Sequence, residues 1–219
     1  MLIDPKNFDR FNMILTGVVV PRPIAFVSTI STEGVVNLAP YSFFNAMAYN
    51  PPTLIFSSSR KAAGWQDKRK DTLTNVEETG EYVVNVVVDD IAAAMNATAA
   101  EYPSDVSEFD VAGLTEAPSE IVKVPRVLES PVNMECRLMQ VVNIGEQPHA
   151  HGLVIGEIVR MHVRDDILYE GPNGLRINHE ALRPTGRLAG NMYCHTDDVY
   201  ELVRPAYVPE EESAGRAAD

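Results

Sequence analysis

The sequence predicts a mainly β protein, folded as a closed antiparallel barrel with helices on its outside. At least six segments are strand-like, and long meanders join them. Only two segments are clear helices, so the strands do not alternate with helices as they do in a parallel βαβ sheet. The 219 residues contain no internal repeat or low-complexity block, which suits one large domain.

The first part of the chain predicts a hairpin behind a short helical lead-in. A helix is expected near Phe11–Leu15. Ile24–Ile30 has the composition of a buried strand, and Ser31–Gly34 supplies turn residues before the β-branched segment Val35–Ala39. Two antiparallel strands therefore follow each other directly.

The stretch Val36–Pro52, VNLAPYSFFNAMAYNPP, is unusually aromatic for a connection between strands, and its prolines exclude a helix. We interpret it as a loop that leads into a third strand, Thr53–Ser59. Phe43, Phe44 and Tyr49 either belong to a ligand site or pack in the core or against a second subunit.

A helix, a strand and a second helix come next. The segment Asp71–Gly80 predicts a helix that Asp71 or Thr72 caps and a glycine ends. Glu81–Val88 is β-branched, which indicates a strand. Asp89–Tyr102 has an acidic start and an alanine-rich body, which predicts the second helix.

The second half begins with an irregular arm and continues with long strands. Prolines punctuate residues 103–130, which we expect to form a surface excursion. Val132–Gly145 and Gly152–Asp166 are predicted as long half-buried strands, paired through a turn at Glu146–Pro148. Gly186–Cys194 is a last short strand-like segment.

Composition sets the class of partner. A net charge of −13 argues against nucleic acid and against an anionic membrane surface. Two cysteines without a CxxC pair indicate a reducing compartment, and from the composition of the chain we expect neither a signal peptide nor a membrane-spanning run. We therefore expect a cytoplasmic protein with one domain over residues 1–204 and a disordered acidic tail over 205–219.

Common catalytic and metal motifs are absent. The sequence lacks GxGxxG after a strand, GxxxxGK[ST] and GxSxG. His149 and His151 lie two residues apart, but no third ligand is visible, so no metal site is predicted. Cys136 and Cys194 lie in apolar surroundings and are interpreted as small buried hydrophobic residues.

One basic cluster stands out in this acidic chain, within Ser57–Thr72. We predict that it binds an anion, because strand-end hydroxyls and the positive end of the following helix lie beside it. A basic surface loop is the alternative. The sequence does not identify which cation contacts a phosphate; the candidates are Arg60, Lys61, Lys68, Arg69 and Lys70. Beside the hydrogen-bonding and aromatic groups of Asn37–Asn45, such a site suits a planar heteroaromatic with a polyol and a phosphate.

An ordered series of motifs resembles the flavin reductase-like, FMN-binding split-barrel family. This family includes the reductase components of two-component flavin monooxygenases and the flavoredoxin-type proteins. The resemblance rests on PRPIAFVSTISTEGVVNLAPYSFFNAMAYNPPTLIFSS, KDTLTNVEETGEYVVNVV, HGLVIGEIVRMHV and GRLAGNMY. It implies a six-stranded antiparallel Greek-key split barrel with peripheral helices, and a homodimer with FMN at its interface.

The resemblance also implies a set of site residues. Those expected along the flavin ring and ribityl chain are Ser28, Thr29, Asn37, Ala39, Pro40, Tyr41, Ser42 and Phe43. Those expected at the phosphate are Ser58, Ser59, Arg60, Lys70 and Thr72, with Lys61 a weaker candidate. Arg187 would reach the ring. His151 would lie on the nicotinamide side, as a catalytic or an oriented structural histidine.

The function that follows is an FMN-binding oxidoreductase that reduces flavin with NADH or NADPH by hydride transfer to N5. An electron carrier without its own nicotinamide site is the alternative, and a different phosphorylated planar ligand is a third possibility. An oxygenase or another electron-transfer protein is the expected partner. The sequence does not identify the electron donor or acceptor, nor the role of the 103–130 arm; excursions of this kind often form a substrate lid or a dimer contact in the family that the chain resembles.

Overall fold

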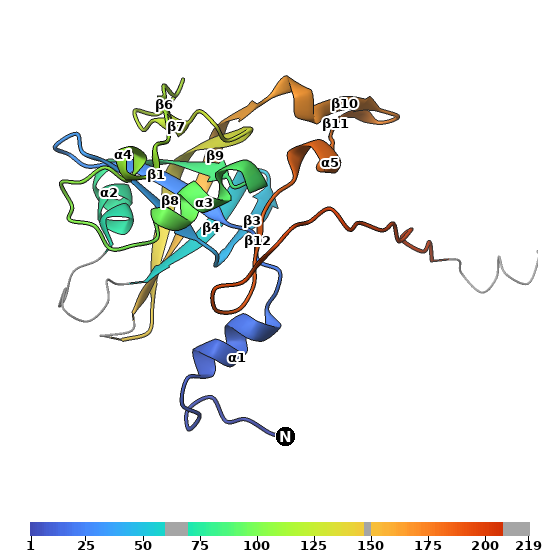
Figure 1. Ribbon diagram of the computed structural model, residues 1–219, viewed down its shortest axis with the longest axis horizontal. Helices are drawn as coiled ribbons and strands as arrows, with labels where there is room; N and C mark the ends of the chain where they lie inside the picture. The colour runs from blue at the N-terminus through green and yellow to red at the C-terminus, as the bar shows by residue number, and fades with distance from the viewer. Residues whose placement is uncertain (60–69, 147–149, 208–219) are drawn as a thin grey trace, which may run out of the picture.

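One large antiparallel sheet dominates the computed structural model, which describes residues 1–59, 70–146 and 150–207 (Figure 1). Seven strands form this sheet in the order β2-β1-β5-β8-β9-β4-β3. Their bounds are β1 (Ala25–Ile30), β2 (Val36–Tyr41), β3 (Phe44–Tyr49), β4 (Pro52–Ser59), β5 (Glu81–Val86), β8 (Val132–Ile144) and β9 (His151–Val163). The predicted mainly β class is confirmed.

Short helices and three two-stranded pairs complete the described chain. The helices are α1 (Phe11–Val18), α2 (Asp71–Thr79), η1 (Asp89–Ile91), α3 (Ala92–Ala97), α4 (Glu108–Ala112), η2 (Asp165–Ile167) and α5 (His179–Leu182). The pairs are β6 (Glu116–Ala117) with β7 (Arg126–Val127), β10 (Leu168–Gly171) with β11 (Gly174–Ile177), and β12 (Gly186–Arg187) with β13 (Tyr193–Cys194). No helix in the described part of the chain is long and apolar enough to cross a membrane.

The sheet is rolled around an apolar core. Along β1, Ala25 and Val27 enter this inner core, while Phe26 packs on the outer face against η1, α3 and α4, as strand periodicity requires. Tyr41 and Phe44, from the two ends of the strand order, contact the same inner core. No ladder joins β2 to β3 among the described residues, so hydrogen-bonded closure of the barrel stays a prediction.

Strand β3, which stands last in the strand order of the sheet, contradicts the predicted loop. Phe44–Tyr49 was expected in a loop, but it pairs antiparallel with β4. It is an edge strand, and five of its six residues are exposed in the single chain. A strand without a buried face has no alternation of apolar and polar residues, so the loop prediction was wrong for want of a periodic signal.

Most local predictions in the first half are confirmed. The β1–β2 hairpin forms, and α2 ends at Gly80, whose φ of 72° is left-handed. The N-cap of α2 is Lys70 without a side-chain cap, so the expected cap at Asp71 or Thr72 was wrong. The second predicted helix is shorter than expected and ends at Ala97.

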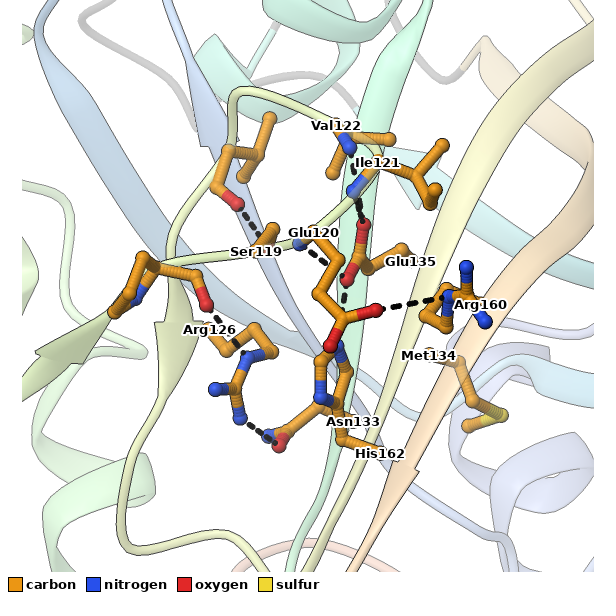
Figure 2. Close-up of polar contacts among 12 residues, drawn as sticks. Ser119, Glu120, Ile121, Val122, Arg126, Asn133, Met134, Glu135, Arg160 and His162 are labelled. Atoms are coloured by element: carbon orange, nitrogen blue, oxygen red, sulfur yellow. Dashed lines mark hydrogen bonds and ion pairs between the residues drawn. The ribbon is translucent and has the colours of Figure 1, made fainter.

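The 103–130 arm is more regular than predicted, because it contains α4 and the β6–β7 pair. Figure 2 shows how it is fastened to the sheet. The buried Glu135 carboxylate on β8 accepts the backbone N–H groups of Glu120 (2.8 Å), Ile121 (2.7 Å) and Val122 (3.0 Å), and it lies 2.6 Å from His162 Nε2. Burial alone raises the pKa of Glu135, but these hydrogen bonds outweigh burial and lower the pKa to about 2.

The region after β9 also differs from the prediction. Figure 1 shows the β10–β11 hairpin and α5 projecting beyond the main sheet, and neither was predicted. Gly186–Cys194 is not one strand but two short strands, β12 and β13, that pair with each other. The predicted turn at Glu146–Pro148 falls mostly outside the described residues, and so does the tail from residue 208.

Candidate functional site

A cationic cavity of about 310 Å³ lies where β2 and β4 end beside α2. Its described lining includes three cationic side chains and no acidic one, although the whole chain carries a net charge of −13. The lining residues are Thr16, Arg22, Pro40, Tyr41, Ser42, Phe43, Ser57, Ser59, Lys70, His151, Arg187, Leu188 and Gly190. An electropositive cavity in an acidic protein indicates an anionic ligand.

Arg22 anchors one wall of this cationic cavity, and its residue is only 6% exposed. Its Nη1 group donates to the carbonyl oxygens of Thr16 and Val19, each at 2.7 Å, at the carboxyl end of α1. Its Nη2 group donates to Leu188 O at 2.8 Å, and Nε reaches Ser42 Oγ at 3.5 Å. The guanidinium thereby joins the end of α1 to Ser42 and to Leu188, and the negative end of the α1 dipole favours its charge.

Arg187 lies next to Arg22 on the same wall. The two residues exchange backbone hydrogen bonds of 2.9 Å. Arg187 Cζ lies 4.4 Å from the centre of the Tyr193 ring, and its guanidinium donates to Gly190 O. Burial, and secondly the positive charge of Arg187, lowers the pKa of Arg22. Two like charges held together in this way favour a bound anion.

Lys70 provides the third cation, at the start of α2. Its Nζ atom lies 5.8 Å from the centre of the Tyr41 ring. The first N–H groups of a helix have no partner within the helix, so a cation and helix donors meet at this point. Thr72 lies one residue into the helix, where its buried hydroxyl accepts a hydrogen bond of 2.8 Å from Asn37 Nδ2. Thr72 therefore has a structural partner as well as a place near the cavity.

Tyr41 places a buried hydroxyl between these groups. The residue is 5% exposed, and its hydroxyl has no hydrogen-bond partner of good geometry among the described residues. Burial raises the pKa of Tyr41 to about 12, although the nearby Thr72 and Ser58 hydroxyls partly oppose this shift. The phenol is thus a protonated donor at neutral pH. The hydroxyl oxygen has almost no exposed surface, so Tyr41 contributes its ring to the cavity wall and its hydroxyl to the interior.

Three consecutive serines at the end of β4 divide between two faces. Ser57 and Ser59 line the cationic cavity, whereas Ser58 is fully buried on the other face. His151 of β9 lies directly opposite Ser59 and also lines the cavity. The Ser57 Oγ and His151 Nδ1 atoms are 3.1 Å apart.

The free edge of β2 offers few backbone donors. On the side away from β1, Leu38 N–H donates to the Glu108 carboxylate at 2.8 Å. Since successive N–H groups of an antiparallel strand face opposite sides, those of the odd-numbered residues of β2 face β1. Pro40 has no N–H group. The backbone donors that remain for a ligand in this segment are those of Ser42 and Phe43.

Two smaller cavities adjoin the cationic cavity through Pro40, which lines all three. One, of about 120 Å³, lies between β2, α2 and residues 98–102. The other, of about 290 Å³, lies between Ser42, Arg187 and Tyr193. The arm closes the first cavity, because Glu108 lines it and Ser104 Oγ donates to Asp71 at 2.9 Å nearby. The combined space suits an elongated ligand.

Most sequence-predicted site residues gather at these three cavities. Ser28, Thr29 and Ser58 do not line them. Ser28 donates to Pro125 O at 2.7 Å, and Thr29 accepts from Asn75 Nδ2 at 3.0 Å. Arg60, Lys61, Lys68 and Arg69 lie outside the described residues. Those brought together are Asn37, Ala39, Pro40, Tyr41, Ser42, Phe43, Ser59, Lys70, Thr72, His151 and Arg187.

Sequence reasoning did not name Arg22 as a site residue. Its partners at 16 and 19 are close in the chain, but Ser42 and Leu188 are brought to it by the fold. Ser57 was expected only as one of three strand-end hydroxyls near a phosphate, and strand alternation places it on the face of Ser59 rather than of Ser58.

Comparison with known proteins supplies the family. The family described as "flavin reductase like domain" matches residues 18–186. The chain is similar to nitrilotriacetate monooxygenase component B from Bacillus cereus, with 40% identity, a TM-score of 0.84, and coverage of 92% of this chain and 98% of that chain. It is also similar to the Pseudomonas fluorescens 2-nitrobenzoate 2-nitroreductase NbaA, with 33% identity, a TM-score of 0.83, and coverage of 95% and 98%.

A third solved structure bears on the fold. It is a flavin-reductase-type protein with a split barrel domain from Shewanella frigidimarina, which matches with a TM-score of 0.76 and 22% identity. The match covers 95% of this chain and all of the other. At that identity the likeness supports the fold alone, as a split-barrel type of β structure.

Proposed function

The chain belongs to the flavin reductase-like family, and on that premise we propose that it is an FMN-binding oxidoreductase that reduces flavin with NADH or NADPH. The observation that carries the proposal is the cationic cavity, which Arg22, Lys70 and Arg187 line and which has no acidic residue in its described lining. A phosphorylated ligand matches that charge, and the adjoining cavities offer space for a longer molecule.

The donor set fits flavin mononucleotide. Lys70, the first N–H groups of α2 and the Ser59 hydroxyl would hold the phosphate. Tyr41 lines this end of the cavity with its ring, while its hydroxyl lies in the interior. Ser42 and Phe43 would offer their backbone N–H groups to the polar edge of the ring, and Arg187 would lie beside it.

When bound, FMN supplies an N5 atom that accepts hydride from a dihydronicotinamide. The role of the chain is to bind and orient both molecules and to place positive charge where negative charge develops on the ring. Arg22 and Arg187 are fixed in advance by carbonyl oxygens, so they need little reorganisation. His151, beside Ser57 and Ser59, would contact the nicotinamide.

We further propose a homodimer with the flavin at its interface. Three features support it: the unpaired edge of β3, the exposed side chains of Met47 and Tyr49 on that strand, and the absence of buried residues in α1. The B. cereus neighbour is a monooxygenase component B, which supports an oxygenase as the partner that receives reduced flavin. A cytoplasmic location stays a prediction from composition.

The test is to mix purified protein with FMN and either NADH or NADPH and to follow nicotinamide absorbance. We expect oxidation of at least one donor, and a flavin spectrum in protein loaded with FMN. Lack of oxidation with both donors would contradict a reductase. If photochemical reduction of the loaded protein still succeeded, the chain would act as an electron carrier instead.

A further inference from the structure

We propose that Ser57 is a positioning residue whose hydroxyl fixes the His151 ring, so that Nε2–H faces the cationic cavity and donates to the carboxamide oxygen of the nicotinamide donor. The inference rests on the proposed function, because that function supplies the nicotinamide. Beyond that function, the inference assigns a role to Ser57, which acts through His151, and specifies the tautomer of the imidazole.

The contact is built into the pairing of β4 with β9. Ser59 pairs with His151, and Ser57 lies two residues along the same face, at the diagonal distance where side chains of neighbouring strands meet. The Ser57 Oγ atom lies 3.1 Å from His151 Nδ1. The backbone of Ser57 is itself fixed, because its N–H donates to Phe43 O at 2.8 Å.

The backbone of His151 is fixed from the opposite face of β9. Gly152 packs against α2 so closely that a Cβ atom there would lie 2.7 Å from Leu73 Cδ2. β9 therefore cannot move inward, and the His151 side chain stays on the cavity face beside Ser57 and Ser59. Once the backbone is fixed, the ring can still rotate, and the Ser57 contact restricts this rotation.

The tautomer of the His151 ring determines whether a donor or an acceptor nitrogen faces the cavity. A neutral imidazole has one N–H and one acceptor nitrogen. When the Ser57 hydroxyl donates to Nδ1, the proton resides on Nε2, which has no partner among the described residues. An N–H donor in the cavity matches a carbonyl oxygen, and the carboxamide is the carbonyl group beside the reacting carbon of a dihydronicotinamide. In the proposed arrangement the Ser57 hydroxyl is the donor to Nδ1, which orients the ring and leaves the Nε2–H group for the cavity.

The kinetic experiment compares Ser57→Ala, Ser57→Thr and His151→Ala in FMN-loaded protein. For Ser57→Ala we expect KM for the nicotinamide nucleotide to rise by about 5- to 20-fold with little change in kcat, because binding is lost equally before and in the transition state. Ser57→Thr should restore KM, since it keeps the hydroxyl on a residue that strands favour. FMN affinity should stay within about twofold of wild type in both variants.

Two comparisons separate positioning from structural damage. In a His151→Ala background, Ser57→Ala should have no further effect on KM, because the ring it positions is gone. Ser130→Ala removes another serine hydroxyl, bonded to Val86 O and Val132 O outside the cavities, and should leave KM unchanged. An equal rise in KM in both His151 backgrounds would overturn the proposal, and so would a loss of FMN affinity in Ser57→Ala.

A spectroscopic measurement does not depend on turnover. Nitrogen NMR of histidine-labelled protein, at a pH where the His151 ring is neutral, should show Nε2–H in the wild type and a mixed tautomer in Ser57→Ala. Identical spectra would overturn the positioning role. If the wild type oxidised neither NADH nor NADPH, the nicotinamide contact and the proposed function would fail together, and the NMR comparison would still decide whether Ser57 orients the ring.

Discussion

The Nε2 atom of His162 lies 2.6 Å from the Oε1 atom of Glu135, at the point where three consecutive backbone N–H groups of the arm also reach that carboxylate (Figure 2). A carboxylate whose pKa is lowered to about 2 is ionised and only accepts hydrogen bonds, so His162 is the donor. The pair joins β8 and β9 to the arm that also covers the site through Glu108.

Replacement of Glu135 by glutamine is expected to destabilise the protein in a pH-dependent way. The pKa of Glu135 is lower in the folded chain, at about 2, than its ordinary value of 4.5, so its stabilisation is complete above 4.5 and is lost as pH falls toward 2. Glu135→Gln should lower the free energy of unfolding at pH 7 by on the order of 3 kcal/mol, and the difference should shrink below pH 4.5. Urea denaturation at several pH values measures both effects.

The matched control is Glu120→Gln, in the same part of the arm. The Glu120 side chain makes an exposed ion pair with Arg160 at 3.2 Å, while its backbone N–H still reaches Glu135. Exposed pairs contribute about 0–1 kcal/mol, so this variant should stay close to wild type. Equal effects of the two substitutions would contradict the assigned role of Glu135.

Gly156→Ala is expected to be strongly destabilising because of one close approach. A Cβ atom at Gly156 would lie 2.0 Å from the buried Tyr82 hydroxyl and 2.8 Å from Tyr82 Cζ. Overpacking of a core typically costs about 1–3 kcal/mol or more. Adding Tyr82→Phe should recover part of the loss, since it removes the nearest atom. Gly17→Ala in α1, where nothing lies within 4 Å of the added carbon, should be neutral or slightly stabilising. Thermal denaturation of all four proteins gives the ranking, and a stable Gly156→Ala would refute it.

Lys70→Ala is expected to weaken FMN binding far more than it weakens the fold. The lysine is half-buried at the start of α2, and among the described residues its ammonium group makes a distant contact with the Tyr41 ring. Loss of one charge-assisted contact to a phosphate should reduce affinity by about 10- to 100-fold. Lys123→Ala removes an exposed lysine of the arm and controls for net charge. Calorimetric titration with FMN and with riboflavin adds a second check, because only FMN affinity should fall.

The sequence alone predicted those parts of the fold that depend on local chemistry. The β1–β2 hairpin follows from turn residues between two apolar runs, and α2 ends at a glycine as expected. It could not show β3, whose exposed side chains carry no alternation. The β10–β11 hairpin was missed although Pro172, Asn173 and Gly174 supply turn residues where its strands meet. The resemblance to flavin reductases, seen in an ordered series of short motifs, is confirmed by the family match.

The sequence by itself determined the class of fold, the family and the segments that carry the site, because periodicity, turn residues and motif order are written along the chain. Only the tertiary structure decided which side chains meet. Arg22 lies beside Arg187, and Ser57 reaches His151, because β-sheet pairing and backbone carbonyls bring together residues far apart in the chain. The tertiary structure also places Ser57 and Ser59 at the cavity and Ser58 in the interior. Strand alternation alone allows either face of β4 to turn inward. Packing decides which face is buried, because Phe56, on the same face as Ser58, packs in the core.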